Sequence, residues 1–385
     1  MKSGTVSNQP PASERQHYDC KIDDYAVIEW PDGQTLRLDL KGRWCTFQSG
    51  SALYRRTLGG EVVARQGTGY RSLGRGEHSR LLDAIHEKLK RFIDENSITG
   101  LSMAEEEQEQ LRQVIERSLK LTLEEYQKDA RSFRGIYPEA VPILPPDRYR
   151  DIVVQPATGC PYGKCNFCMF YKDQRFHILG QAEFRDQLTR IKEFMGPSIQ
   201  SRDGVFLGSA SALSIPQNKL IPFLEMISKE FSFAKRGISA FMDPHHMPKR
   251  GVDEYKHLAT RGLRQVVIGL ESGAPALRKE LGKSDKLDEL TGTIAQLKEA
   301  GLQLGLTVLV GAGGAVWAPT HLQKTAGYIR NLPLDSGDIV YLSPLVEGNR
   351  KRVPEKEVKR FRKELKVLTQ ARLVPYRIHY FRYFS

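Results

Sequence analysis

Cysteine is scarce in this chain of 385 residues: it has five, and two of them, Cys20 and Cys45, lie far from the other three. This distribution does not predict a disulfide framework, and it suits a reducing compartment. No apolar run approaches the roughly 18 residues needed to cross a bilayer, and residues 1–10 lack the apolar core of a signal peptide. We therefore expect a cytoplasmic protein with no membrane contact.

Positive charge is plentiful but unevenly distributed. The chain carries 58 basic and 46 acidic residues, a net charge of +12. Residues 349–385 hold 12 Lys or Arg against 3 Glu, so most of the surplus lies there. Such a segment either binds phosphates or nucleic acid or forms the solvated face of an amphipathic helix. The sequence leaves both interpretations open.

Composition divides the chain into parts. Residues 1–17 are polar and contain two adjacent prolines, which predicts a disordered tail. Residues 18–136 begin with short strand patterns, including a hairpin, and continue with helical patterns at about 77–95 and 103–129, so we expect a smaller α+β domain of unknown role. Four prolines fall within residues 137–147. Since proline neither continues a helix nor donates to a sheet, this segment predicts a linker.

Apolar runs then alternate with helical patterns in residues 148–345. The six candidate strands are 152–155, 204–207, 237–241, 265–270, 303–310 and 338–342. Repeated βα units joined by right-handed crossovers form a parallel sheet. We therefore predict an α/β fold, a partial (β/α)6 TIM-like barrel, followed in residues 346–385 by a basic helix and a closing strand. Functional residues in such folds lie at the carboxyl ends of the strands.

The other three cysteines, Cys160, Cys165 and Cys168, have the spacing C-x4-C-x2-C. Thiolates this close in sequence converge on one metal centre rather than pair with each other. Three ligands leave one position of such a centre open, and an open position is where chemistry takes place. The triplet follows the first predicted strand of the barrel, at the end where the fold places active sites.

The triplet and three later segments resemble the radical S-adenosylmethionine (radical SAM) enzymes, most closely the branch whose cores are like oxygen-independent coproporphyrinogen oxidase and the Elongator catalytic subunit. Residues 165–168, Cys-Asn-Phe-Cys, match the second half of the family pattern C-x3-C-x-aromatic-C, while the first gap is one residue longer. The later matches, residues 205–213, 266–273 and 307–314, keep the family order. The resemblance covers the chain from about residue 148 to its end.

The resemblance implies a [4Fe-4S] cluster on Cys160, Cys165 and Cys168, whose fourth iron takes the amino and carboxylate groups of SAM. An electron from a donor such as flavodoxin or ferredoxin would then cleave SAM to methionine and a 5′-deoxyadenosyl radical, which abstracts hydrogen from a substrate. It also implies a set of SAM contacts, namely Phe167, Tyr171, Gly208, Ser209, Ala210, Ser239, Glu271, Val310 and Gly311.

Glu271 and the pair His245 and His246 are polar residues for which the sequence suggests particular partners. Glu271 ends a buried strand, where an unpaired carboxylate is costly, so a ribose hydroxyl or a cation is its expected partner. His245 and His246 follow the third strand and could bind metal or substrate, although two adjacent loop histidines are more often solvated.

The sequence does not specify the substrate. It contains no second cysteine cluster, which argues against sulfur insertion from an auxiliary cluster, and residues 1–145 contain no Asp-x-His-x-x-Gly run for cobalamin. A small biosynthetic metabolite is the first hypothesis, and tRNA or another RNA is the second.

An alternative from another class is a zinc-containing nucleic-acid-binding protein. Cys160, Cys165, Cys168 and His177 could form a Cys3His zinc site. Aromatic and arginine residues also interleave in residues 376–384, as in proteins that stack on bases and neutralise phosphates. Zinc, however, does not account for the later segments that match the radical SAM enzymes.

Overall fold

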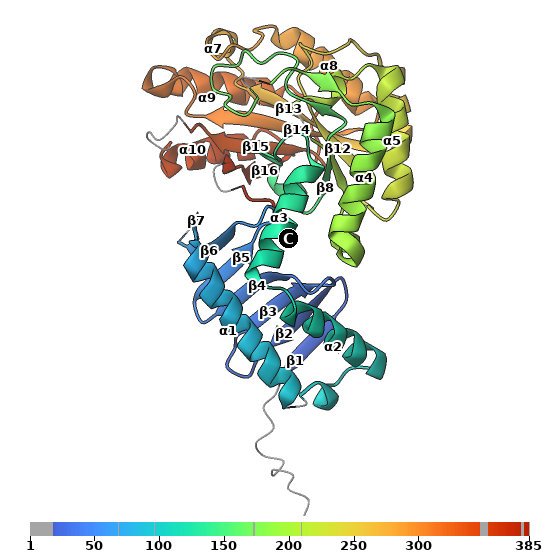
Figure 1. Cartoon of the computed structure of the whole chain (residues 1–385). Helices are drawn as coiled ribbons and strands as arrows, with labels where there is room; N and C mark the ends of the chain where they lie inside the picture. Colours follow the sequence, from blue (N-terminus) through green and yellow to red (C-terminus); the bar gives the residue numbers. More distant parts are fainter. Residues whose placement is uncertain are drawn as a thin grey trace, which may run out of the picture. The chain divides into compact units, whose positions relative to one another are not determined.

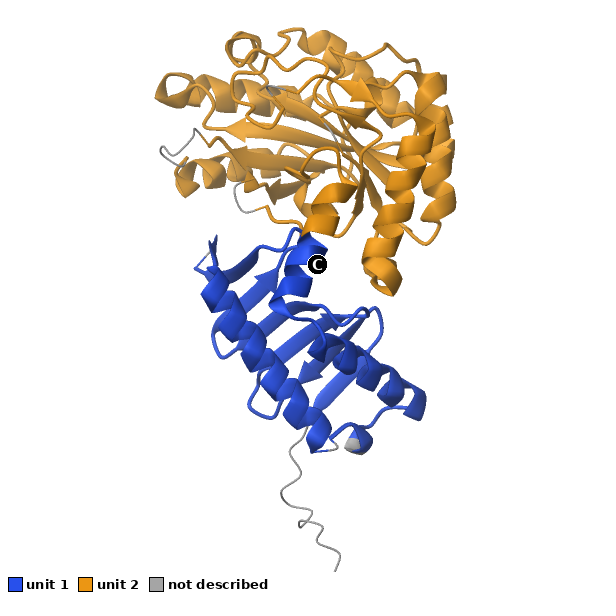
Figure 2. Cartoon of the chain, in the orientation of Figure 1, with its two compact units in different colours: residues 1–130, 384–385 blue, residues 131–383 orange. Residues whose placement is uncertain are grey.

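The computed structural model describes residues 18–67, 69–95, 97–171, 174–208, 210–346, 353–378 and 381–384, so the predicted disordered tail of residues 1–17 lies outside the described residues. The chain divides into two compact units (Figure 2). Unit 1 comprises residues 1–130 and 384–385, and unit 2 comprises residues 131–383. The division falls within helix α3 (Leu123–Ile136), ahead of the segment predicted as a linker.

Unit 1 is built on a seven-stranded antiparallel sheet in which each strand pairs with the next along the chain. Its strands are β1 (Asp19–Ile22), β2 (Tyr25–Glu29), β3 (Thr35–Asp39), β4 (Trp44–Ser49), β5 (Ala52–Arg56), β6 (Val62–Gln66) and β7 (Gly69–Ser72). The predicted hairpin is confirmed in β2 and β3. Gly33 in its turn has a φ of 76°, a backbone conformation that costs little only for glycine.

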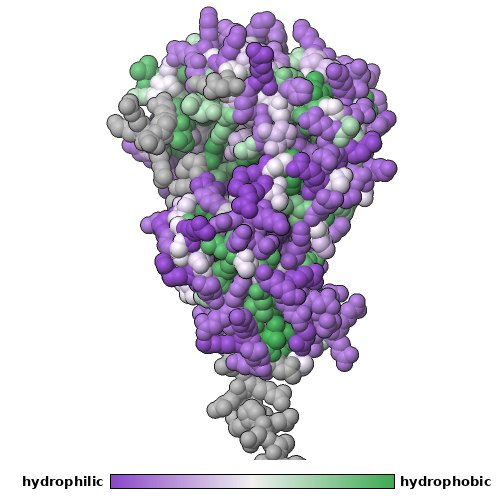
Figure 3. Space-filling model, viewed as in Figure 1, coloured by the Kyte–Doolittle hydropathy of each residue, from purple (hydrophilic) through white to green (hydrophobic). Residues whose placement is uncertain are grey.

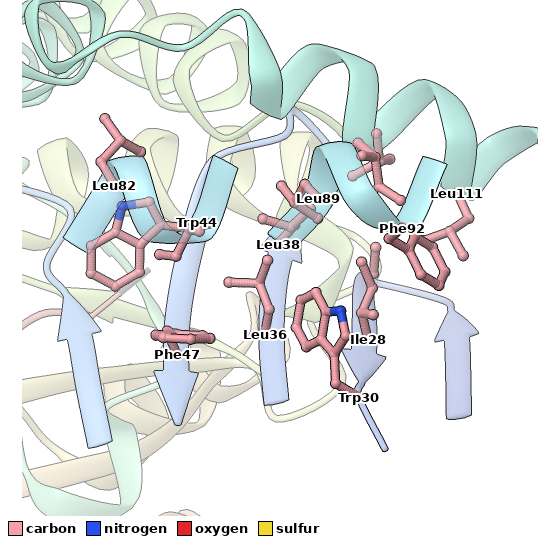
Figure 4. Packing of buried hydrophobic residues seen from close by; sticks show 14 of the residues in the cluster. Ile28, Trp30, Leu36, Leu38, Trp44, Phe47, Leu82, Leu89, Phe92 and Leu111 are labelled. Atoms are coloured by element: carbon pink, nitrogen blue, oxygen red, sulfur yellow. The ribbon is translucent and has the colours of Figure 1, made fainter. Parts of the chain in front are cut away.

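Helices α1 (Arg75–Asp94) and α2 (Glu105–Leu119) pack on one face of this sheet (Figure 4). Residues alternate along the strands, so Ile28, Leu36 and Leu38 face the helices. The helices contribute apolar residues at helical spacing to the same core, among them Leu82, Leu89, Phe92 and Leu111. Their outward faces are polar, and the surface in Figure 3 is mostly hydrophilic.

The helix predicted over residues 103–129 is wrong as a single element. Helix α2 ends at Leu119, and α3 begins at Leu123. The Thr122 hydroxyl accepts a hydrogen bond from the backbone N of Glu125 at 3.2 Å. A threonine that satisfies a free N–H in the first turn favours a new helix start, which explains the break.

Unit 2 contains a seven-stranded parallel sheet in the order β16-β15-β14-β13-β12-β11-β8. These strands are β8 (Ile152–Val154), β11 (Val205–Leu207), β12 (Ile238–Met242), β13 (Leu263–Glu271), β14 (Gln303–Val310), β15 (Ile339–Pro344) and β16 (Arg372–Pro375). The predicted α/β fold is therefore confirmed, and six of the seven strands coincide with predicted ones.

Helices follow the strands and cover this sheet (Figure 1). They are α4 (Gln181–Met195), α5 (Gln217–Glu230), α6 (Val252–Thr260), α7 (Pro275–Glu280), α8 (Leu287–Glu299), α9 (Gly314–Arg330) and α10 (Glu355–Lys366), and a short hairpin of β9 (Ala157–Thr158) and β10 (His177–Ile178) follows β8. On α10, Val358, Phe361 and Leu365 are buried, which leaves its basic residues on the other face. No helix in the described ranges is long and apolar enough to span a bilayer.

Strands β8 and β16 are the two edges of the sheet, and among the described residues they do not pair with each other. The C-terminal segment instead contacts β8 through one side chain. The Tyr383 hydroxyl donates to the carbonyl of Asp151 at 2.7 Å and accepts from the backbone N of Val153 at 3.2 Å. Tyr383 thus connects the end of unit 2 to its first strand through two hydrogen bonds.

Candidate functional site

A cavity of about 530 Å³ lies at the carboxyl ends of the parallel strands of unit 2. This volume is in the range of sites that hold cofactors and small molecules. Residues at the ends of neighbouring strands, or just beyond them, line the cavity: Ala210, Asp243, Glu271, Leu309 and Ser343. The loop that follows β8 completes it, and all three clustered cysteines line the cavity.

The segment that ends α7 holds the cysteine loop in place. The backbone N of Asn166 donates to the Leu281 carbonyl at 3.0 Å, and the Tyr162 hydroxyl donates to the Gly282 carbonyl at 2.6 Å. Gly282 has a φ of 73°, and a Cβ there would lie 2.6 Å from the Lys164 carbonyl oxygen. Only glycine therefore allows this close approach of the two segments.

The three thiols are free and partly buried. The Sγ of Cys160 accepts a hydrogen bond from the backbone N of Gly163 at 3.3 Å. Burial raises the pKa of the Cys165 thiol to about 12 and also raises that of Cys168. Both therefore bind a metal only when the metal displaces the proton.

The arrangement of these thiols bears on which metal centre fits. In the described part of the chain, no three His, Cys, Asp or Glu side chains come close enough together to hold one metal ion. His177, the proposed fourth zinc ligand, is exposed on β10. Three thiolates on one loop would suit an iron–sulfur cluster, whose remaining iron would take a ligand from outside the protein.

A buried lysine sits beside this loop. The Lys283 Nζ lies 3.1 Å from Asp243 Oδ2, and the Lys283 side chain is 7% exposed. Burial pulls the pKa of Lys283 down, but the carboxylates of Asp243 and Glu271 raise it above its ordinary value. Burial would raise the pKa of Asp243, yet Lys283 and His246 hold it well below its usual range. The cavity therefore contains a fixed cation close to Cys165. Its charge opposes the rise in the pKa of Cys165 that burial causes.

The histidines after β12 are not solvated, so that expectation is wrong. The side chain of His245 is 7% exposed and that of His246 is 24% exposed. The His246 ring stacks on Tyr162 with centroids 3.6 Å apart, and its Nδ1 lies 3.2 Å from Asp243 Oδ2. His246 therefore links the cysteine loop to the lysine–aspartate pair.

Glu271 ends β13 with a φ of 59°, the one left-handed conformation among the described residues other than glycine. The register between β13 and β14 shifts between Gly269 and Glu271, and such a bulge re-aims the side chain. The Thr307 hydroxyl lies 3.4 Å from one carboxylate oxygen. Burial raises the pKa of Glu271, and the nearby charge of Lys283 opposes that rise. A cation is thus one of its neighbours, as the sequence suggested.

The structure brings some of the predicted SAM contacts together and not others. Those that line the cavity are Phe167, Tyr171, Ala210 and Glu271. Those that do not line it are Gly208, Ser239, Val310 and Gly311, and Ser209 lies outside the described residues.

The backbone positions of Ser239 and Gly311 explain why these two residues do not line the cavity. Ser239 is fully buried on β12 and lies two residues, about 7 Å, before Phe241, the first residue of this strand that lines the cavity. Gly311 has a φ of 85°, and a Cβ there would collide with the side chain of Val353 rather than face the cavity.

Sequence reasoning missed Lys283 and Asp243 as site residues. Asp243 directly follows a predicted strand, which is a usable signal, because carboxyl ends of parallel strands meet at one edge of the sheet. Lys283 follows a short helix in a loop, and nothing in its sequence context distinguishes it from a surface lysine.

Part of unit 2 is similar to known proteins. Residues 154–316 match the family model of the radical SAM superfamily. No curated protein sequence matches the chain. Among solved structures, a radical SAM methyltransferase from Sphaerobacter thermophilus is 17% identical, over 61% of this chain and 68% of its own, with a TM-score of 0.46.

Two other structures are similar to parts of the chain. SuiB from Streptococcus suis is 12% identical over 86% of this chain and 72% of its own, with a TM-score of 0.46. The methyltransferase TsrM from Kitasatospora setae, solved with cobalamin and a [4Fe-4S] cluster, is 16% identical over 50% of this chain and 34% of its own, with a TM-score of 0.38. The chain thus spans about a third of TsrM.

Proposed function

We propose that this chain, in which residues 154–316 are a radical SAM domain, reductively cleaves SAM and uses the resulting radical to abstract hydrogen from a small molecule. The predicted family, enzyme class and cofactors are confirmed, since radical SAM proteins are enzymes that bind a [4Fe-4S] cluster and SAM. The observation that supports the proposal is that Cys160, Cys165 and Cys168 line one cavity together with Lys283 and Glu271.

The residues of the cavity suit the two cofactors. Cys160, Cys165 and Cys168 would hold three irons and leave one for SAM. When bound, the cluster supplies the electron that splits SAM into methionine and a 5′-deoxyadenosyl radical. Lys283 is a buried ammonium that would pair with the SAM carboxylate, and such charge-assisted bonds are strong when shielded from water.

The other residues orient the bound molecule. Glu271 would accept hydrogen bonds from hydroxyl or amino groups of SAM, and the Thr307 hydroxyl would donate to or accept from them. Their oxygens lie together at the ends of adjacent strands. Phe167 and Leu309 belong to one apolar cluster beside the cavity. They would pack on an uncharged ring and exclude water.

The reaction also needs an electron donor. We infer a small one-electron carrier such as flavodoxin or ferredoxin, because the chain has no further cysteine cluster to store an electron. A reducing compartment such as the cytoplasm would protect an oxygen-sensitive cluster and suits the few cysteines of the chain.

A direct test is anaerobic reconstitution with iron and sulfide, followed by incubation with SAM and dithionite. We expect a brown protein with broad visible absorbance and formation of 5′-deoxyadenosine and methionine. A colourless protein with bound zinc, or a brown protein that leaves SAM intact, would contradict the proposal.

A further inference from the structure

Apolar side chains form a continuous wall of the cavity away from its charged groups. Ile143, Val267 and Tyr376 pack into one cluster, with Phe241 and Ile378 against it, and all five line the cavity. Three of the four charged residues in the described lining, Lys283, Asp243 and Glu271, lie near Cys165, and the fourth is Arg382. The cavity is therefore divided into a charged part near the cysteines and an apolar part.

Exposed hydrophobic residues concentrate at the same cavity. The described chain has five large hydrophobic side chains with high exposure: Met169, Phe170, Val316, Val346 and Val367. Three of them line the cavity, Met169 at 73%, Phe170 at 37% and Val346 at 37% exposed. Leaving apolar surface in water is unfavourable, and when such residues gather at one concave place they mark a ligand site.

The apolar part offers little to a charged ligand. Among the described lining residues, the cations are Lys283 and Arg382. Lys283 is paired with Asp243, and the Arg382 guanidinium donates to the Phe381 carbonyl at 2.8 Å. With Lys283 assigned to the SAM carboxylate, Arg382 is the one cation of the described lining left for a phosphate or a nucleic-acid backbone, too few to offset its desolvation.

We propose that the substrate is a neutral, largely apolar small molecule, which packs on the wall formed by Ile143, Val267, Phe241, Tyr376 and Ile378 and contacts Val346, which also lines the cavity. This inference rests on the proposed function, because it assigns the charged part of the cavity to SAM. The same cavity would also hold the cluster and SAM, because the three cysteines, Lys283 and Glu271 line it, and this favours a compact substrate.

Binding of Nile red, a neutral apolar dye, to the anaerobically reconstituted protein tests the inference. We expect saturable binding with enhanced fluorescence. Val346→Asp should weaken it at least fivefold, because a carboxylate that lines the cavity must be desolvated when the dye binds. Val367→Asp is the matched control: Val367 is 81% exposed and does not line the cavity, so this variant should bind the dye within twofold of the parent.

Equal weakening in the two variants, or displacement of the dye by yeast tRNA at low salt, would overturn the inference. Iron content and visible absorbance of the Val346→Asp variant show whether its fold and cluster are intact, and a second variant, Ile378→Asp in the apolar wall, should weaken the dye in the same way. Selective dye binding in a protein that fails to cleave SAM would support the apolar site and count against the proposed reaction alone.

The substrate class itself is tested by SAM turnover. A chloroform extract of the producing cells should raise the yield of 5′-deoxyadenosine over the buffer control, and total RNA from the same cells should not. A rise with RNA and none with the extract would overturn the inference while leaving radical chemistry in place.

Discussion

The hydroxyl of Ser272 lies 2.9 Å from Nδ1 of His321 in the interior of unit 2, directly beside Glu271. The other ring nitrogen, Nε2, lies 3.1 Å from the Leu309 carbonyl, which can only accept, so Nε2 carries the hydrogen. In the neutral ring Nδ1 is then an acceptor for the Ser272 hydroxyl, and the Thr325 hydroxyl lies 3.1 Å from the same nitrogen. Burial lowers the pKa of His321, which favours this neutral form.

This network holds the strand end that carries Glu271. The Ser272 hydroxyl also accepts from the Ala274 backbone N at 3.0 Å. His321→Leu should lower the free energy of unfolding by about 1–3 kcal/mol, because it leaves buried hydroxyls unpaired. It should also weaken SAM binding, while His321→Gln, which can still accept at this position, should lose less of both. Chemical denaturation and equilibrium binding of SAM are the measurements, and equal behaviour of the two variants would contradict the role of the hydrogen bonds.

Each cysteine of the triplet should be necessary for the cluster. Alanine at Cys160, Cys165 or Cys168 removes one of three protein ligands, so iron content and 5′-deoxyadenosine formation should fall to background. Cys20→Ala is the matched control, because Cys20 lies on β1 in unit 1 and should change neither quantity. Full SAM cleavage in all three variants would refute the cluster assignment.

Lys283 should determine affinity for SAM. Lys283→Met removes the buried ammonium and its ion pair with Asp243, so SAM should bind about 10–100-fold more weakly, the loss expected for one charged hydrogen bond. The exposed Lys286, which pairs with Glu289 at 2.9 Å, provides the control variant Lys286→Met. Calorimetric titration of SAM into the reconstituted protein measures both, and unchanged affinity in Lys283→Met would rule out the carboxylate contact.

Stability of unit 1 should depend on pH through His78. This ring is buried next to Trp44, with centroids 6.0 Å apart, and burial, assisted by Arg56, lowers its pKa from 6.5 to about 4. Between pH 6.5 and 4 the unfolded chain therefore binds a proton that the folded chain excludes. The free energy of unfolding should fall by about 2 kcal/mol as the pH drops through this window.

Tryptophan fluorescence during denaturation measures this effect, since Trp44 reports on unit 1. His78→Leu should reduce the pH dependence and leave the smaller part due to His86, whose pKa burial also lowers, and the exposed His177→Leu should retain it in full. An identical pH profile for the parent and His78→Leu would show that other groups are responsible.

Much of the fold followed from local patterns. The alternation of apolar runs and helical segments predicted the strands of unit 2, because side-chain periodicity reflects which face of an element is buried. The break between α2 and α3 was missed, since the apolar spacing continues through it and only the cap at Thr122 interrupts the helix. Strands β1, β5 and β7 were missed because almost none of their residues is fully buried, so they carry little apolar alternation.

Local sequence indicated only part of the site. Phe167 and Glu271 lie in short segments with a recognisable pattern, and both line the cavity. Lys283 and Asp243 are 40 residues apart and are joined only when α7 brings Gly282 against the cysteine loop. Ser239 was expected too close to the cavity, because sequence does not show how deep along a strand a residue lies.

The sequence by itself determined that three cysteines lie in one loop after the first strand of the parallel sheet, because they fall within nine residues of each other. It also determined the parallel sheet, through the period of its apolar residues. Only the tertiary structure decided which charge faces the thiols and where the apolar wall stands. Those relationships join residues from different strands and loops, and the free energy that holds them comes from packing across the whole unit rather than from any single segment.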